Sequence, residues 1–141
     1  MRPSALWIVV LSCGSLVGCR GEKAGGRVFG ALVKDGKPLV LPEDEEIDMK
    51  LVSVDPEASL TEASVVFDRA AGTFRVQGPT QERIPPGEYK IVIIWKTSDD
   101  EVPDRFDGDL DDENTPLRCT VERKGEHELV IDVKEKTVTE K

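Results

Sequence analysis

The segment 99–113 is the part of the chain whose residue types most resemble a metal site. It holds nine carboxylates and a single basic residue, Arg105. Carboxylate oxygens are the ligands that Ca²⁺ prefers. An EF-hand alignment that starts at Asp107 places Asp109 and Asp111 at the third and fifth positions. The sixth position, where that loop needs glycine, is then another aspartate. A regular calcium loop is therefore excluded.

Two interpretations of this acidic loop are left. Asp107, Asp109 and Asp111 are the calcium candidates of an irregular site. The alternative is a solvated loop whose like charges repel one another, and the run of acids favours it. The shorter acidic run 43–46 has the same interpretation, a charged loop that leads into a strand. We accordingly expect no metal and no cofactor.

Residues for catalysis are sparse. The chain has one histidine, His127, and it lies in a segment that alternates like a strand. The sequence contains no Gly-x-Ser-x-Gly elbow, no phosphate-binding glycine loop and no His-x-x-Glu pair. Cys119 alternates with Leu117 and Val121, a pattern that predicts a buried and unreactive thiol. We therefore expect no catalytic residues and no enzyme activity.

The chemistry that the N-terminus does suggest is a covalent modification of Cys19. Arg2 precedes a short apolar run, and no acidic residue occurs before Glu22. This arrangement is typical of a secretory signal and is too short for a lasting membrane helix. The run ends in Leu-Val-Gly-Cys at 16–19, which resembles a lipobox, the processing motif of bacterial lipoproteins. The resemblance implies a signal peptide at 1–18 and a lipid on the Cys19 thiol.

A lipidated Cys19 would tether the chain to a membrane of the bacterial cell envelope, facing the periplasm or the cell exterior. Residues 19–26 are predicted to form the lipidated cysteine and a flexible leash, because glycine and charged residues dominate them. The formal net charge of −9 makes nucleic acid an unsuitable partner. The expected partners are the membrane, through the lipid anchor, and an envelope protein.

The rest of the chain is predicted to be a single all-β domain at 27–133 with a frayed, charged tail at 134–141. The strongest strand signal follows the Pro-Pro-Gly turn at 85–87, where Ile91 and Ile93 face one side and Val92 and Ile94 face the other. Turn residues separate the predicted strands, and no segment has a convincing helical period. Seven strands are expected, at 27–34, 47–54, 63–68, 73–77, 87–97, 117–123 and 126–133.

Three landmarks in this order resemble a known family. Residues 28–39, with the Asp-Gly-Lys-Pro-Leu run, resemble the opening of carboxypeptidase regulatory-like domains. Gly-Thr-Phe-Arg-Val at 72–76 and Ile-Pro-Pro-Gly-Glu-Tyr-Lys-Ile at 84–91 resemble its later landmarks. Segments from Pro103 onward resemble the C-terminal half of small bacterial lipoproteins that consist of this domain alone. The resemblance implies a seven-stranded, transthyretin-like (prealbumin-like) β-sandwich, from which the acidic segments 42–48 and 95–117 depart.

These observations together predict a non-catalytic, lipid-anchored β-sandwich domain of the bacterial cell envelope, with a structural or protein-interaction role. The alternative hypothesis is a calcium- or carbohydrate-binding module that uses the acidic loop 99–113.

Overall fold

The computed structural model describes residues 25–78 and 82–141, and this part of the chain is all-β. The signal segment 1–18 and the lipidation candidate Cys19 lie outside the described residues. Among those residues, no helix is long and apolar enough to cross a membrane. The strands are β1 (Gly26–Lys34), β2 (Lys37–Pro38), β3 (Glu46–Ser53), β4 (Glu62–Asp68), β5 (Thr73–Gln77), β6 (Arg83–Ile84), β7 (Gly87–Lys96), β8 (Arg118–Val121), β9 (Glu126–Asp132) and β10 (Thr137–Glu140).

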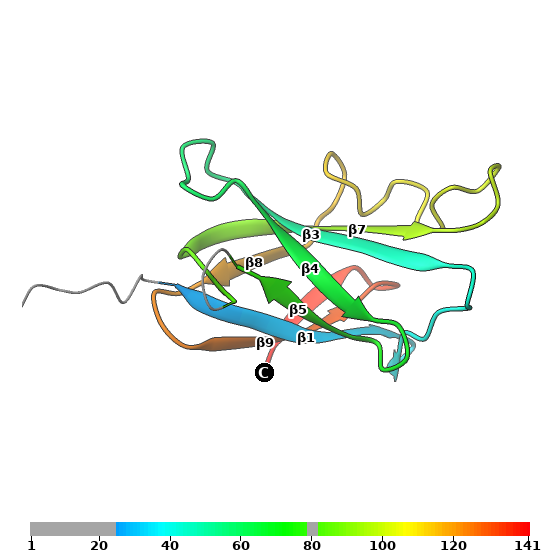
Figure 1. Ribbon diagram of the computed structural model, residues 1–141, viewed down its shortest axis with the longest axis horizontal. Coiled ribbons are helices and arrows are strands. Elements are labelled where there is room, and N and C mark those ends of the chain that lie inside the picture. The colour runs from blue at the N-terminus through cyan, green and yellow to red at the C-terminus, as the bar shows by residue number, and fades with distance from the viewer. Residues whose placement is uncertain (1–24, 79–81) are drawn as a thin grey trace, which may run out of the picture.

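The ten strands form one hydrogen-bonded sheet that curves back on itself into two layers. Their order is β10-β9-β1-β5-β4-β3-β7-β8, and the short strands β2 and β6 both pair with β1. Figure 1 shows β3, β7 and β8 in the upper layer and β1, β5 and β9 in the lower one. All neighbouring strands are antiparallel except β1 and β9, which run parallel over 27–33. The result is a sandwich or barrel-like arrangement around one core.

β7 is the most deeply buried strand, as its residue types predicted. Ile91 and Ile93 are fully buried in the core, and Val92 on the opposite face is only 2% exposed. β3 pairs with β7 along its whole length, from Glu46 opposite Lys96 to Ser53 opposite Tyr89. β8 covers the first part of the other edge. Both faces and both edges of the strand are therefore partly covered, which explains its continuous apolar run.

Two of the turns that separate the strands form as their residue types require. Asp35 and Gly36 both have positive φ angles, 53° and 74°, which is the geometry of a type I′ hairpin turn. The hairpin of β4 and β5 places Phe67 directly opposite Phe74. It turns at Gly72, where φ is 71° and where a Cβ would lie 2.9 Å from the backbone nitrogen of Leu39. Glycine is needed there for both conformation and space.

The two ends of the domain differ from the sequence prediction. Gly25 and Gly26 were assigned to the leash, but Gly26 opens β1 and the Gly25 N–H donates a hydrogen bond to the Arg123 carbonyl at 2.8 Å. The tail 134–141 was expected to fray, yet β10 pairs with β9 and places Val138 opposite Ile131. That expectation was wrong because edge pairing to β9 supplies backbone hydrogen bonds that the tail's charged composition does not reveal.

Candidate functional site

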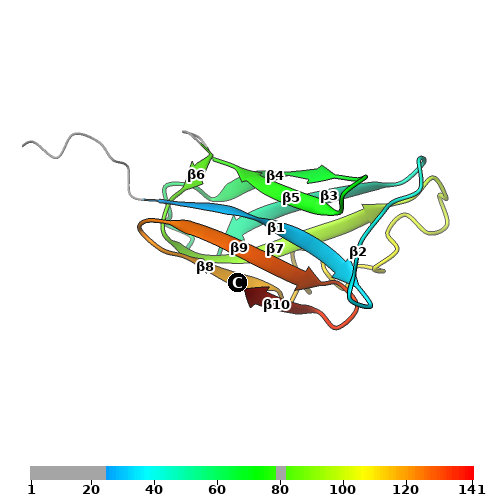
Figure 2. The ribbon, with the colours of Figure 1, turned by 90° about the horizontal axis from the view of Figure 1, so that it is seen from below.

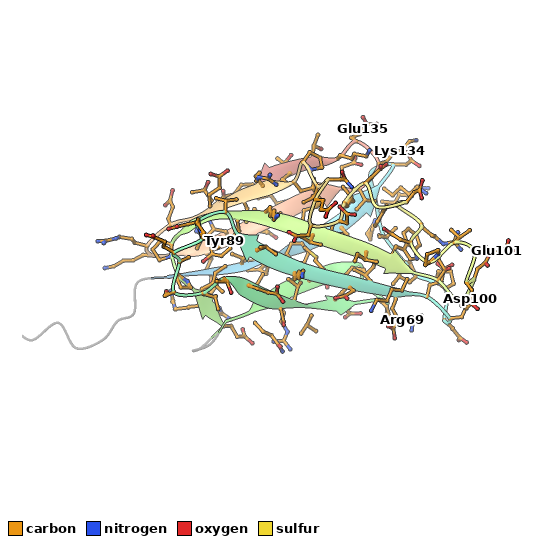
Figure 3. All side chains as sticks on the ribbon, turned by 90° about the horizontal axis from the view of Figure 1, so that it is seen from above. Arg69, Tyr89, Asp100, Glu101, Lys134 and Glu135 are labelled. Atoms are coloured by element: carbon orange, nitrogen blue, oxygen red, sulfur yellow. The ribbon has the colours of Figure 1, made fainter. Side chains whose placement is uncertain are left out.

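Nearly half of the 28 acidic residues belong to two segments that meet at one end of the sandwich. The segment 42–46 enters β3 there, and the loop 97–117 leaves the end of β7 beside it, because Glu46 and Lys96 are opposite each other in the two strands. Figure 3 shows Asp100 and Glu101 at this end, which is remote from the point where β1 begins. We call the described segments 42–46 and 97–114 the acidic end.

Glu45 is the centre of the acidic end. Its side chain is only 4% exposed, which is unusual for a carboxylate. The Trp95 indole Nε1–H donates to Oε2 at 2.7 Å, and the Arg105 Nε–H donates to Oε1 at 2.8 Å. A second nitrogen of Arg105 also bonds Oε1. The hydrogen bond from Arg105 lowers the pKa of Glu45, burial opposes this shift, and the Trp95 hydrogen bond adds to it. The carboxylate is therefore held ionised.

Aromatic contacts complete this cluster. The Arg105 guanidinium carbon lies 5.6 Å from the centre of the Trp95 ring, within cation–π range. The Phe106 ring contacts Trp95 edge-on, with 5.7 Å between the ring centres. Arg105 thus bridges a buried carboxylate and an aromatic face, and it fixes the loop against the end of β7.

Asp104 is the second residue that anchors the loop. Its Oδ1 accepts hydrogen bonds from the backbone N–H groups of Trp95, at 3.1 Å, and Phe106, at 3.0 Å. Its Oδ2 accepts from the Gly108 N–H at 3.0 Å. One carboxylate thus satisfies three backbone donors, one on β7 and two in the loop that follows. This is the role that aspartate commonly has in turns.

The structure does not gather the side chains of the three calcium candidates into one site. Asp109 forms an ion pair with Lys136 at 3.0 Å. Asp111 accepts the backbone N–H of Asn114 at 2.8 Å and thereby closes a turn. Asp107 has a positive φ of 52°. Among the described residues, no group of three or more histidine, cysteine, aspartate or glutamate side chains is arranged to hold a metal ion.

The acidic loop is also less free than the expected solvated, self-repelling loop. Besides the turns closed by Asp104 and Asp111, the Asp112 side chain pairs with Lys90 of β7, and this contact lowers the pKa of Asp112. The Ile93 N–H donates to the Leu110 carbonyl at 2.9 Å, and Leu110 is fully buried in the core. Several carboxylates are therefore structural acceptors, while the loop as a whole still carries a large negative charge.

A shallow hollow of about 170 Å³ opens beside Glu45. It is smaller than the roughly 300–1,000 Å³ typical of sites for small molecules. Within it, the Ser98 hydroxyl donates to Asp44 at 2.9 Å. The lining residues are Asp44, Glu45, Thr97, Ser98, Asp99, Val102 and Arg105.

Cys119 and His127 are both buried, and their neighbours indicate a structural role. Cys119 is 8% exposed, and burial raises the pKa of its thiol to about 12, so the reactive thiolate is disfavoured at neutral pH. His127 is 5% exposed. Its Nε2 accepts the Glu122 backbone N–H at 3.1 Å, and its Nδ1 lies 2.8 Å from Oε1 of Glu140 on β10. Both ring nitrogens thus connect neighbouring segments, and neither residue lines the hollow beside Glu45.

Comparison with known proteins adds no identification: no family model matches the chain, and neither a curated protein nor a solved structure is significantly similar to it.

Proposed function

We propose that this chain is a non-catalytic, lipid-anchored β-sandwich domain of the bacterial cell envelope, with a structural or protein-interaction role. The observation that carries the proposal is the Leu-Val-Gly-Cys motif at 16–19, directly after an apolar run. Only six residues separate Cys19 from the first strand at Gly26. At about 3.5 Å per residue, the seven steps from Cys19 to Gly26 span roughly 25 Å at most, so the domain would stay close to the lipid.

The architecture is compatible with a carboxypeptidase regulatory-like, transthyretin-like domain, which is the finer fold that we propose. The seven strands predicted from the sequence correspond to β1, β3, β4, β5, β7, β8 and β9. The described residues add the short strands β2 and β6, which pair with β1, and β10, which is an edge strand next to β9. The family landmarks fall at the β1–β2 turn, at β5 and at the start of β7, where turn chemistry and core packing both constrain the residues.

A non-catalytic role is supported by the surroundings of the side chains that could react, because each is buried or hydrogen-bonded to neighbouring segments. The thiol of Cys119 is buried, and the imidazole of His127 is hydrogen-bonded between Glu122 and Glu140. Glu45, Asp104 and their partners fix a loop in place. Such a domain can present a rigid surface to another envelope component.

Lipidation can be tested on the full chain produced in a bacterium that processes lipoproteins. We expect the protein to partition into the detergent phase and its N-terminal peptide, by mass spectrometry, to begin at an acylated Cys19. A Cys19→Ser variant should lose both properties. Cys13→Ser is the matched control, because it removes a thiol within the same segment and should leave processing intact. If Cys19→Ser is still cut before residue 19 and still partitions with detergent, the lipoprotein proposal is wrong.

A further inference from the structure

The middle strand of the lower layer carries apolar side chains on its outer face. Val28 and Leu32 of β1 are buried in the core, so the alternating residues Phe29, Ala31 and Val33 must face outward. These three are only partly buried. Figure 2 looks onto this layer and shows β4, β5, β1 and β9 side by side. We call the outward side chains of β5, β1 and β9 the β1 outer face.

The two flanks of this face carry opposite charges. Phe29 is directly opposite Arg75 on β5 and, on its other side, opposite Glu128 on β9. Both of these charged residues are exposed. Next along the strand, Ala31 is opposite Val130 of β9, which extends the apolar area. The β1 outer face is therefore an apolar row with the guanidinium of Arg75, which Glu82 contacts, on the β5 flank and carboxylates on the β9 flank.

A hollow of about 300 Å³ lies on this face next to Phe29. Arg27 and Arg75 both contact Glu82 there, at 2.9 and 2.7 Å. Because a guanidinium has five N–H donors, these two side chains can bind a further carboxylate without releasing Glu82. The residues that line the hollow are Arg27, Val28, Phe29, Arg75, Val76, Glu82 and Glu126.

We propose that the β1 outer face is the interface of a homodimer whose two-fold axis runs along β1. Rotation about that axis exchanges the β5 and β9 flanks of the face. Arg75 of each copy then meets Glu128 of the other, and the carboxylate enters the hollow beside Phe29. The apolar rows pack against each other along the axis. A two-fold axis across the strands would instead place Arg75 over Arg75, so the charges select one orientation.

A second copy fits this face better than a partner of uniform charge. An acidic partner would meet Glu128 on one flank, and a basic partner would meet Arg75 on the other, whereas the two-fold copy places Arg75 against Glu128 on both flanks. Sheets that stack face to face lie about 10 Å apart, a distance that side chains such as Phe29 fill. The interface leaves the acidic end free, because that end belongs to the loops beyond β3 and β7.

Cysteine crosslinking in intact cells tests the proposal, with the full chain and a membrane-permeant bis-maleimide. Ala31→Cys lies on the proposed axis, so two copies bring their thiols together and a crosslinked dimer should form. Thr120→Cys is the matched control, because Thr120 is equally part of a strand but is exposed on β8 in the other layer. The chain with only its native cysteines gives the background. This experiment does not depend on lipidation of Cys19.

Charge variants in the Ala31→Cys background test the orientation. Arg75→Glu and Glu128→Arg, each alone, should abolish the crosslinked dimer by placing like charges opposite each other. The double variant has the parent's net charge and should restore the crosslink, which also shows that the variants fold. The proposal is overturned by an Ala31→Cys dimer no stronger than background, by a dimer that both single variants leave unchanged, or by capture of a different protein in its place.

Discussion

At the scale of single residues, Glu45 shows how a carboxylate is kept inside a protein. Removing a charge from water is costly unless the charge is paired and hydrogen-bonded. Glu45 meets both conditions, with Arg105 on one oxygen and the Trp95 indole on the other. The Trp95 N–H and the Arg105 guanidinium would in turn lose their charged acceptor if Glu45 were neutralised. The three groups therefore stabilise one another as a unit.

We predict that Glu45→Gln lowers the melting temperature at pH 7, because the amide cannot supply a charged acceptor to Arg105. The folded-state pKa of Glu45 lies below its ordinary value of 4.5. The carboxylate thus contributes stability that is fully present above pH 4.5 and is lost as the pH falls through the folded-state pKa. The difference in melting temperature between parent and variant should be constant near neutrality and shrink in acid.

Glu43→Gln is the control for this prediction. Glu43 is exposed and lies two residues away, so its substitution removes the same charge from the same segment. We expect little change in melting temperature at any pH. Equal effects of the two substitutions across the pH range would show that the Glu45–Arg105 contact does not stabilise the fold.

Sequence reasoning could not distinguish Glu45 from its neighbours. Four acidic residues stand in a row at 43–46, and only the third is buried. The partner that makes this burial possible, Arg105, is 60 positions along the chain. No local pattern carries that information. The signal available was compositional: Arg105 is the single basic residue in an acidic segment, which marks it as a partner for some carboxylate without naming which one.

At the scale of elements, β7 determines how the layers meet. The fully buried Ile93 is opposite Met49 of β3, and its backbone N–H donates to the Leu110 carbonyl of the acidic loop. One strand thus joins the core, the upper layer and the loop that leaves its end. Because the acidic loop is attached to β7 through backbone hydrogen bonds, packing of β7 should influence the order of that loop.

We predict that Ile93→Ala lowers the free energy of unfolding by about 2–5 kcal/mol, through lost burial and a cavity next to Met49. Domains of this size are typically stable by only about 5–15 kcal/mol, so the loss is large. The measurement is the denaturant midpoint of the parent and variant chains. Ile94→Ala, on the partly exposed opposite face, should cost less. A midpoint for Ile93→Ala equal to that of the parent would remove Ile93 from the core.

The sequence predicted elements better than it predicted their pairing. Alternation and turn residues identified seven strands because most of them bury one face. β10 was missed because Val138 is its only apolar residue and its stability comes from pairing with β9. The parallel pairing of β1 with β9 joins opposite ends of the chain, and neither strand contains a signal for it.

At the scale of the whole molecule, charge is distributed unevenly. The segments 43–48 and 99–113 hold 14 of the 28 acidic residues. The segment 43–48 and the first part of the loop lie at the end of the sandwich remote from the start of β1, as Figures 1 and 3 show, and the last part of the loop runs back along β7 as far as Lys90. For a domain tethered at Cys19, this arrangement keeps the acids away from an anionic lipid surface, whose repulsion extends about 8 Å at physiological ionic strength. The acidic end would then face outward, toward other components of the envelope.

The acidic loop also allows a whole-molecule test of its two interpretations. Lys90 and Lys136 each pair with one of its nine carboxylates, and Arg105 pairs with Glu45 outside the loop. We therefore expect added monovalent salt to raise the melting temperature by screening the remaining repulsion, and calcium at matched ionic strength to do no more. A bound calcium ion would instead stabilise the folded state by about 2.7 kcal/mol at a hundredfold excess over Kd.

The variant with Asp107, Asp109 and Asp111 all changed to asparagine separates these outcomes. Loss of the Asp109–Lys136 ion pair should lower its melting temperature in every buffer, so only the difference between calcium and salt is informative. A calcium-specific rise in the parent that vanishes in this variant would establish a metal site that the structure does not assemble.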